Sequence, residues 1–157
     1  MSAAPQAVLY TDTARVVSVL HVDDDDLVPG MLDPAGLAME LSVELFDWLP
    51  DHAAVKAAGV ASGATPTAVQ QWDCLRLWCA YRAAASLLAN PLSIRKTVSD
   101  GISTDDRFPL DLPAMLQDVK QKAAYYQATL VKSRTAVAPV FAAKLTSDTP
   151  AYDPVTG

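Results

Sequence analysis

The chain has 157 residues, 51% of them hydrophobic, and a formal net charge of −6 at pH 7. This length fits one domain, the hydrophobic content excludes a disordered chain, and no uncharged run of about 18 apolar residues exists to span a membrane. The negative charge argues against nucleic-acid binding by the whole surface, because such affinity comes from neutralising phosphates.

Residues 1–10 are predicted to be a lead-in arm. They lack the basic and apolar regions of a secretion signal, so we expect a protein made and used in a cytosol. A first helix follows to Leu20, because the side chain of Thr11 or Asp12 can cap its free backbone N–H groups. The carboxylates of Asp23–Asp26 repel one another and lack the pattern of a calcium loop, which indicates a solvated turn rather than a cation site.

A second helix is predicted to begin at Asp33-Pro34, where an N-cap residue precedes a proline at the first helical position. Pro50 ends it, and residues 51–58 are expected to add one or two turns before Gly59. One side of the second helix is expected to be buried, because apolar residues recur there at helical spacing while acidic residues occupy the other side. The apolar residues are Leu37, Leu41, Leu45 and Trp48, and the acidic ones are Glu40, Glu44 and Asp47.

A third helix is predicted from Pro66 to Ala89, capped by Thr65 and stopped by Asn90-Pro91, where the residue before proline leaves helical geometry. Apolar residues occupy nearly all of its sides, which is typical of a helix in the middle of a bundle. Its two cysteines point about 140° apart on the helix, so we expect buried, reduced thiols rather than a disulfide. Core packing is also expected for the three tryptophans, Trp48, Trp72 and Trp78.

The segment after Pro91 is predicted to be a short β-hairpin, because an Asp-Gly pair lies between two β-tolerant runs. The runs are Ile94–Val98 and Ile102–Thr104, on either side of Ser99-Asp100-Gly101. The hairpin loop, about residues 92–108, is dense in both signs of charge: Arg95, Lys96, Asp100, Asp105, Asp106 and Arg107.

Asp111 is expected to cap a last long helix, Leu112–Leu130, whose apolar residues recur at alternating steps of four and three. The chain after it contains three prolines and no sustained period, so residues 135–157 are predicted to be an extended tail. The sequence therefore predicts an all-α fold, a small bundle of about four helices within residues 11–134. The short hairpin or extended loop lies between the last two long helices.

Residues with an evident catalytic role are missing. His21 and His52 lack the spacing of a zinc protease, and no nucleophile elbow or phosphate-cradling glycine loop exists. Asp105-Asp106 could hold magnesium as in nucleases, but adjacent carboxylates on a loop are more often surface charge. We expect no enzyme activity, no cofactor and no metal site. The charged hairpin and the apolar residues of the tail instead favour assembly with other subunits. The alternative is that the hairpin is a surface loop that makes no such contact.

Several segments together resemble the head–tail connector, or adaptor, proteins of tailed bacteriophages. They are the capped helix DPAGLAMELSVELFDWLP, the central helix LWCAYRAAASLLANP, the loop TVSDGISTDDRF and the helix LPAMLQDVKQKAAYYQATL. The resemblance covers roughly residues 10–132. It lies in the order of the helices and the loop and in the general composition of each. It implies a virion structural protein, assembled in the host cytoplasm, that forms a ring of about 12 copies beneath the portal protein at the capsid–tail junction.

In such rings double-stranded DNA passes through the channel without specific binding, and a downstream neck or tail protein docks below. The resemblance makes the C-terminal tail the portal anchor, through Pro139, Val140, Phe141, Leu145 and Tyr152. It makes the hairpin loop the inter-subunit or downstream contact, through Arg95, Lys96, Asp100, Asp105, Asp106 and Arg107. The alternatives are a small regulatory or protein-binding module, similar to a toxin–antitoxin component, and a metal-dependent nuclease.

Overall fold

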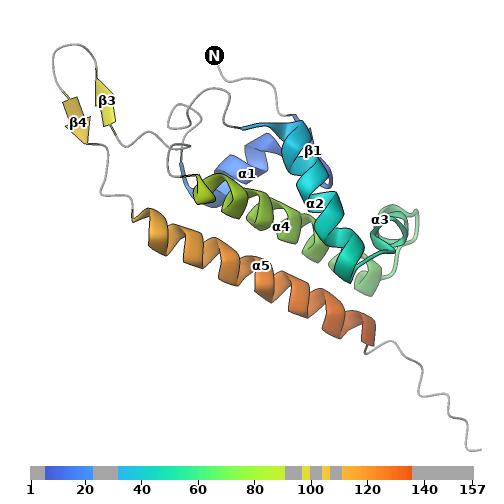
Figure 1. Cartoon of the computed structure of the whole chain (residues 1–157). Coiled ribbons are helices and arrows are strands. Elements are labelled where there is room, and N and C mark those ends of the chain that lie inside the picture. Colours follow the sequence, from blue (N-terminus) through green and yellow to red (C-terminus); the bar gives the residue numbers. More distant parts are fainter. Residues whose placement is uncertain (1–5, 23–31, 91–96, 100–103, 107–110, 136–157) are drawn as a thin grey trace, which may run out of the picture.

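A computed structural model describes residues 6–22, 32–90, 97–99, 104–106 and 111–135. The chain order is β1 (Ala7–Val8), β2 (Thr11–Asp12), α1 (Thr13–Leu20), α2 (Pro34–Trp48), α3 (His52–Val60), α4 (Pro66–Ala89), β3 (Thr97–Ser99), β4 (Thr104–Asp106) and α5 (Leu112–Thr135) (Figure 1). The all-α prediction is confirmed. The described part of the chain has five helices, one of them the short helix expected after Pro50.

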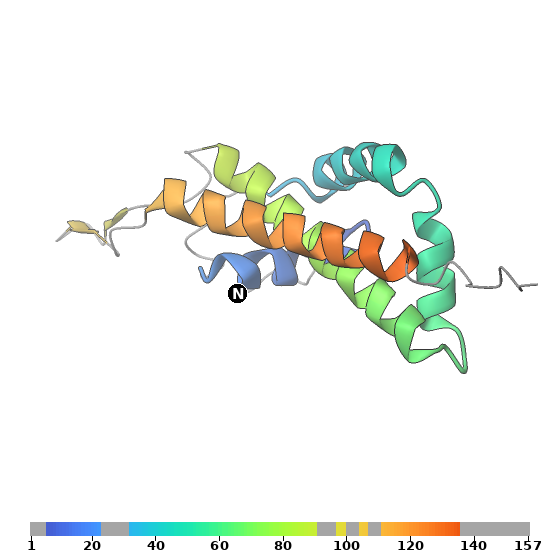
Figure 2. The same ribbon diagram turned by 90° about the horizontal axis from the view of Figure 1, so that it is seen from below.

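The central element is α4, which packs against each of the other four helices. In Figures 1 and 2, α5 runs beside α4 and crosses it at a shallow angle, while α1 and α2 lie on other sides of α4. Ala80, Ala83, Ala84 and Ala85 are buried in α4, and their small side chains allow close approach of the neighbouring helices. Both cysteines of α4 are buried and free, as predicted.

The predicted helix starts are confirmed by side-chain caps. Asp12 Oδ1 accepts a hydrogen bond from Arg15 N at 2.8 Å, and Thr65 Oγ1 accepts one from Ala68 N at 3.2 Å. Asp33 and Asp111 cap α2 and α5 in the same way. Each such cap contributes about 1 kcal/mol of stability, since it satisfies a backbone N–H that has no partner within the helix.

The prediction of a lead-in arm was wrong for the last residues of that segment. β1 pairs antiparallel with β2, and Val8 is completely buried in the core. Leu9 and Tyr10 make the turn between the two strands, and the φ of 50° at Leu9 lies in the left-handed region. A two-residue strand is too short to show the apolar alternation by which strands are recognised in a sequence. Only the packing of the folded chain identifies this segment as part of the core.

Two helices run further than predicted. α3 continues through Gly59 to Val60, because this glycine lies against α4: a Cβ built on it would be 2.3 Å from Trp72 Cβ. α5 continues one turn beyond Leu130 to Thr135, where Arg134 forms an ion pair with Asp51 at the start of α3. Both extensions depend on contacts distant in sequence.

The predicted hairpin is confirmed with different strand bounds. β3 and β4 pair antiparallel, and the register joins Ser99 to Thr104 and Thr97 to Asp106. The strands therefore lie further along the chain than predicted, and four residues rather than three connect them.

Asp23–Asp26 lies outside the described residues. Among the helices described, none is long and apolar enough to cross a bilayer.

Candidate interaction surfaces

Most contact residues predicted from the sequence lie outside the described residues. Asp105 and Asp106 are placed by their backbone on β4, opposite Val98 and Thr97 of β3. The others lie outside the described ranges: Arg95, Lys96, Asp100 and Arg107 in the loop, and Pro139, Val140, Phe141, Leu145 and Tyr152 in the tail. Their contacts stay predictions.

α2 carries an apolar stripe on its outer side in addition to the leucines that it buries. Met39, Val43 and Phe46 are 72%, 60% and 72% exposed. Steps of four and three residues put these side chains on one side of the helix, turned away from the buried Leu37, Leu41 and Leu45. We call these three residues the α2 stripe. Single exposed apolar residues are ordinary, whereas a contiguous group of large ones indicates a surface that another molecule covers.

The acidic side of α2 is directed towards α4. Arg82 donates two hydrogen bonds to the Glu44 carboxylate, with Nε···Oε2 at 2.7 Å and Nη2···Oε1 at 2.5 Å. These bonds raise the pKa of the Arg82 guanidinium, although its partial burial acts in the opposite direction. Such a two-bond pair fixes orientation as well as distance, and together with the buried Leu37, Leu41 and Leu45 it is consistent with a rotation of α2 that leaves the α2 stripe exposed.

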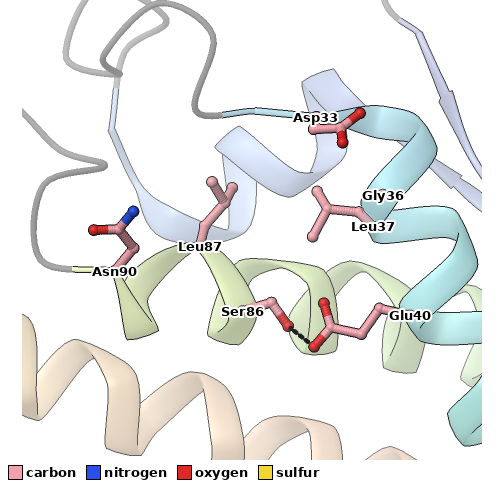
Figure 3. Close-up of a pocket in the computed structure, with 7 residues that line it drawn as sticks. All are labelled: Asp33, Gly36, Leu37, Glu40, Ser86, Leu87 and Asn90. Carbon is pink, nitrogen blue, oxygen red and sulfur yellow. Dashed lines mark hydrogen bonds between the residues drawn. The ribbon is translucent and has the colours of Figure 1, made fainter.

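A small pocket of about 240 Å³ lies between the start of α2 and the end of α4 (Figure 3). Both carboxylates that line it, those of Asp33 and Glu40, accept hydrogen bonds within the chain. Asp33 Oδ1 accepts a hydrogen bond from Ala35 N at 3.1 Å, and Glu40 Oε1 accepts one from Ser86 Oγ at 3.0 Å. Since these oxygens serve as a helix cap and an interhelical acceptor, the pocket is a packing gap between two helices.

A larger open groove of about 430 Å³ lies between α2 and α5 and reaches the surface of α4. Trp48 and Trp78 meet edge to face beside it, with ring centroids 5.1 Å apart. Asp47 of α2 and Lys120 of α5 lie on its rims. Both side chains are exposed, and neither forms an ion pair within the described part of the chain.

The outer side of α5 is uncharged along much of its length. Five exposed residues recur there at steps of four, three, four and three: Gln117, Gln121, Ala124, Ala128 and Val131. We call them the α5 face. This spacing matches the seam along which two helices pair in a coiled coil, and the alanines leave room for larger side chains of a partner. Lys120 and Lys132 border the face on its two sides.

The point from which the C-terminal tail departs is fixed by an ion pair between α5 and α3. Arg134 donates two hydrogen bonds to the Asp51 carboxylate, one of them Nη1···Oδ1 at 2.8 Å. These bonds lower the pKa of Asp51. Asp51 follows the C-terminal end of α2, so α5 ends beside the junction of α2 and α3.

Cys79, Tyr10 and His52 take part in the packing in and around the core. Burial raises the pKa of the Cys79 thiol to about 12, which keeps it protonated at neutral pH. Tyr10 Oη and His52 Nδ1 are 2.5 Å apart, and Tyr10 also packs edge to face on Trp72, with ring centroids 5.4 Å apart. Within the described ranges, no three His, Cys, Asp or Glu side chains are grouped to hold a metal ion.

Sequence reasoning missed the α2 stripe, although its signal is present. Met39, Val43 and Phe46 form a second apolar repeat, offset from the leucine repeat by a fraction of a turn. A helix with two such repeats is apolar on more of its circumference than one core can cover.

No family model matches the chain, and neither a curated protein nor a solved structure matches it.

Proposed function

We propose that the chain is a structural protein of a tailed-phage virion, a head-to-tail adaptor. Copies of it form a ring under the portal protein, extend the DNA channel and link the capsid to a neck or tail protein. The observation that carries the proposal is the exposed α2 stripe, because an adaptor must present apolar surface that its own fold leaves uncovered. Assembly would bury these side chains.

Three further features support this function. The helices follow the order that the resemblance to phage adaptors implies, with a hairpin between the last two long helices. The end of α5, after which the C-terminal tail begins in the sequence, is held to the start of α3 by the Arg134–Asp51 pair. The net charge of −6 suits a conduit for DNA, because a basic lining would retain the phosphates.

In this function the chain acts as an assembly component without catalytic residues, cofactor or metal. Its partners are the portal protein through the tail, a downstream neck or tail protein, and further copies of itself. It would be assembled in the host cytoplasm and reside at the capsid–tail junction of the virion.

A second candidate function is a small regulatory module that binds one protein partner. The α2 stripe also favours this alternative, because residues at i, i+4 and i+7 are the usual anchors of a helix that lies in an apolar groove. The two functions differ in stoichiometry: the module forms one-to-one complexes, while the adaptor forms a multimeric ring.

Light scattering coupled to size exclusion separates the two candidates. The adaptor is expected to give a high-order complex when mixed with a portal protein, whether or not it assembles alone. A strict monomer or dimer that ignores portal protein would exclude the adaptor function. A variant lacking residues 137–157 is expected to lose portal binding while its helical circular dichroism stays unchanged, and unaltered binding would exclude the tail as anchor.

A further inference from the structure

Two exposed helical surfaces of this chain share one spacing. The α2 stripe follows steps of four and three, and the α5 face repeats these steps over five residues. α4 packs against both helices, so each presents its free side away from α4 (Figures 1 and 2). Two of the three side chains of the α2 stripe are large, those of Met39 and Phe46. The α5 face includes the small residues Ala124 and Ala128. The bulky side chains of the α2 stripe can pack where Ala124 and Ala128 make the α5 face shallow.

The two helices are also complementary in charge. α2 contains three acidic residues and no lysine or arginine; Glu44 is paired with Arg82 of the same chain, which leaves Glu40 and Asp47. α5 contains four basic residues and one aspartate; Arg134 is paired with Asp51 and Lys122 with Asp118, which leaves Lys120 and Lys132. The exposed Asp47 on α2 and the exposed Lys120 and Lys132 on α5 form no ion pairs with described residues. Charge of opposite sign guides two surfaces together, while like charges oppose contact.

The same charges decide between two modes of self-association. Packing of α2 on α2 across a twofold axis would bring two acidic helices together, and packing of α5 on α5 would bring together two basic ones. Contact between α2 of one copy and α5 of the next pairs opposite charges. Such a contact is heterologous, since each copy uses two different surfaces, and it can repeat until a ring closes.

The lengths of the two surfaces are compatible. At 1.5 Å per residue, the α2 stripe spans about 10 Å and the α5 face about 21 Å along the helix axis. The α2 stripe is therefore shorter than the α5 face, so all three of its side chains can contact the face. We propose that copies of this chain associate head to tail, the α2 stripe of one copy packing on the α5 face of the next. This proposal deepens the proposed adaptor function, on which it rests, by naming the ring interface.

Disulfide trapping between singly substituted chains tests the contact. Chains carrying Val43→Cys and Ala124→Cys are mixed at about 1 mM, a concentration at which even a contact with a millimolar dissociation constant is populated. The native thiols of α4 are buried and stay unreactive. We expect a cross-linked heterodimer in the mixture and at least tenfold less dimer in either variant alone. As a matched control, Ala57→Cys on the exposed side of α3 is mixed with Ala124→Cys and should give no more dimer than either chain alone.

Abundant dimer in Val43→Cys alone would overturn the proposal in favour of a twofold contact between α2 helices. Equal cross-linking in the Ala57→Cys control, or none in the mixture, would also overturn it. Binding to a portal protein is measured separately on the wild-type chain. A portal-bound ring without this cross-link refutes only the interface, whereas the cross-link without portal binding refutes only the adaptor function.

Discussion

Leu45 and Phe46 are neighbours in sequence that the structure puts on different sides of α2. Leu45 is completely buried, whereas Phe46 is 72% exposed. Truncating a buried leucine to alanine costs about 3–5 kcal/mol through lost burial and the cavity left behind. Truncating an exposed side chain changes the free energy of unfolding by about 0.5 kcal/mol or less. Leu45→Ala and Phe46→Ala therefore form a matched pair with opposite expected effects.

The expected difference is large enough for ordinary thermal unfolding. In a chain of this size, 1 kcal/mol corresponds to about 2–4 °C in Tm, so Leu45→Ala should unfold at least about 6 °C earlier while Phe46→Ala stays within about 2 °C of wild type. Circular dichroism of the helical signal measures both. A loss in Phe46→Ala as large as that in Leu45→Ala would refute the structure of α2, because Phe46 would then belong to the core of the monomer.

The same substitution should weaken assembly. Complete burial of a phenylalanine contributes about 1.5–3 kcal/mol, and Phe46 has 72% of its surface still to bury. About 1–2 kcal/mol per contact corresponds to a roughly 5- to 30-fold weaker association of Phe46→Ala. Sedimentation equilibrium or light scattering over a concentration series measures this change. Unaltered association of a stably folded Phe46→Ala would show that the α2 stripe takes no part in assembly.

Three further outcomes are expected. Gly59→Ala should destabilise the protein by about 1–3 kcal/mol in chemical denaturation, because the added Cβ meets Trp72; wild-type stability would contradict the close packing of α3 on α4. The lowered pKa of Asp51 means that the ion pair with Arg134 stabilises the fold above the ordinary carboxyl value of 3.8, and this contribution is lost as the pH falls through the lower folded value. Asp51→Asn should therefore be less stable than wild type at pH 7 by less than about 1 kcal/mol, with a difference that shrinks in acid; a constant difference would refute the assignment. The Cys79 thiol, with its pKa raised to about 12, should react with a thiol reagent at pH 8 only after unfolding, and rapid reaction of the native protein would contradict its burial.

The helices could be predicted because their signals are local. Asp33 with Pro34, and Thr65 with Pro66, combine a side-chain cap with a residue already set in helical geometry. Neither signal depends on the rest of the fold. The end of α5, by contrast, is held by the pairing of Arg134 with Asp51, which lies 83 residues away, so no local pattern gave its position.

The interaction surfaces were harder to predict, because exposure is a property of the whole fold. The apolar repeat of Met39, Val43 and Phe46 could equally have faced a second core layer. Its exposure accompanies the burial of Leu37, Leu41 and Leu45 and the pairing of Glu44 with Arg82, which occupy other sides of α2. The contacts proposed for the hairpin loop and the tail depend on partner molecules, and no single-chain pattern determines them.

The most direct measurement of the central claim is electron microscopy of the wild-type chain mixed with a portal protein. The adaptor function predicts an added ring of density on one end of the portal, coaxial with its channel. The Phe46→Glu variant should give less of this ring, because a carboxylate in place of the phenyl group opposes burial of the α2 stripe. Portal particles with no added density, at concentrations where both proteins stay folded, would contradict the claim.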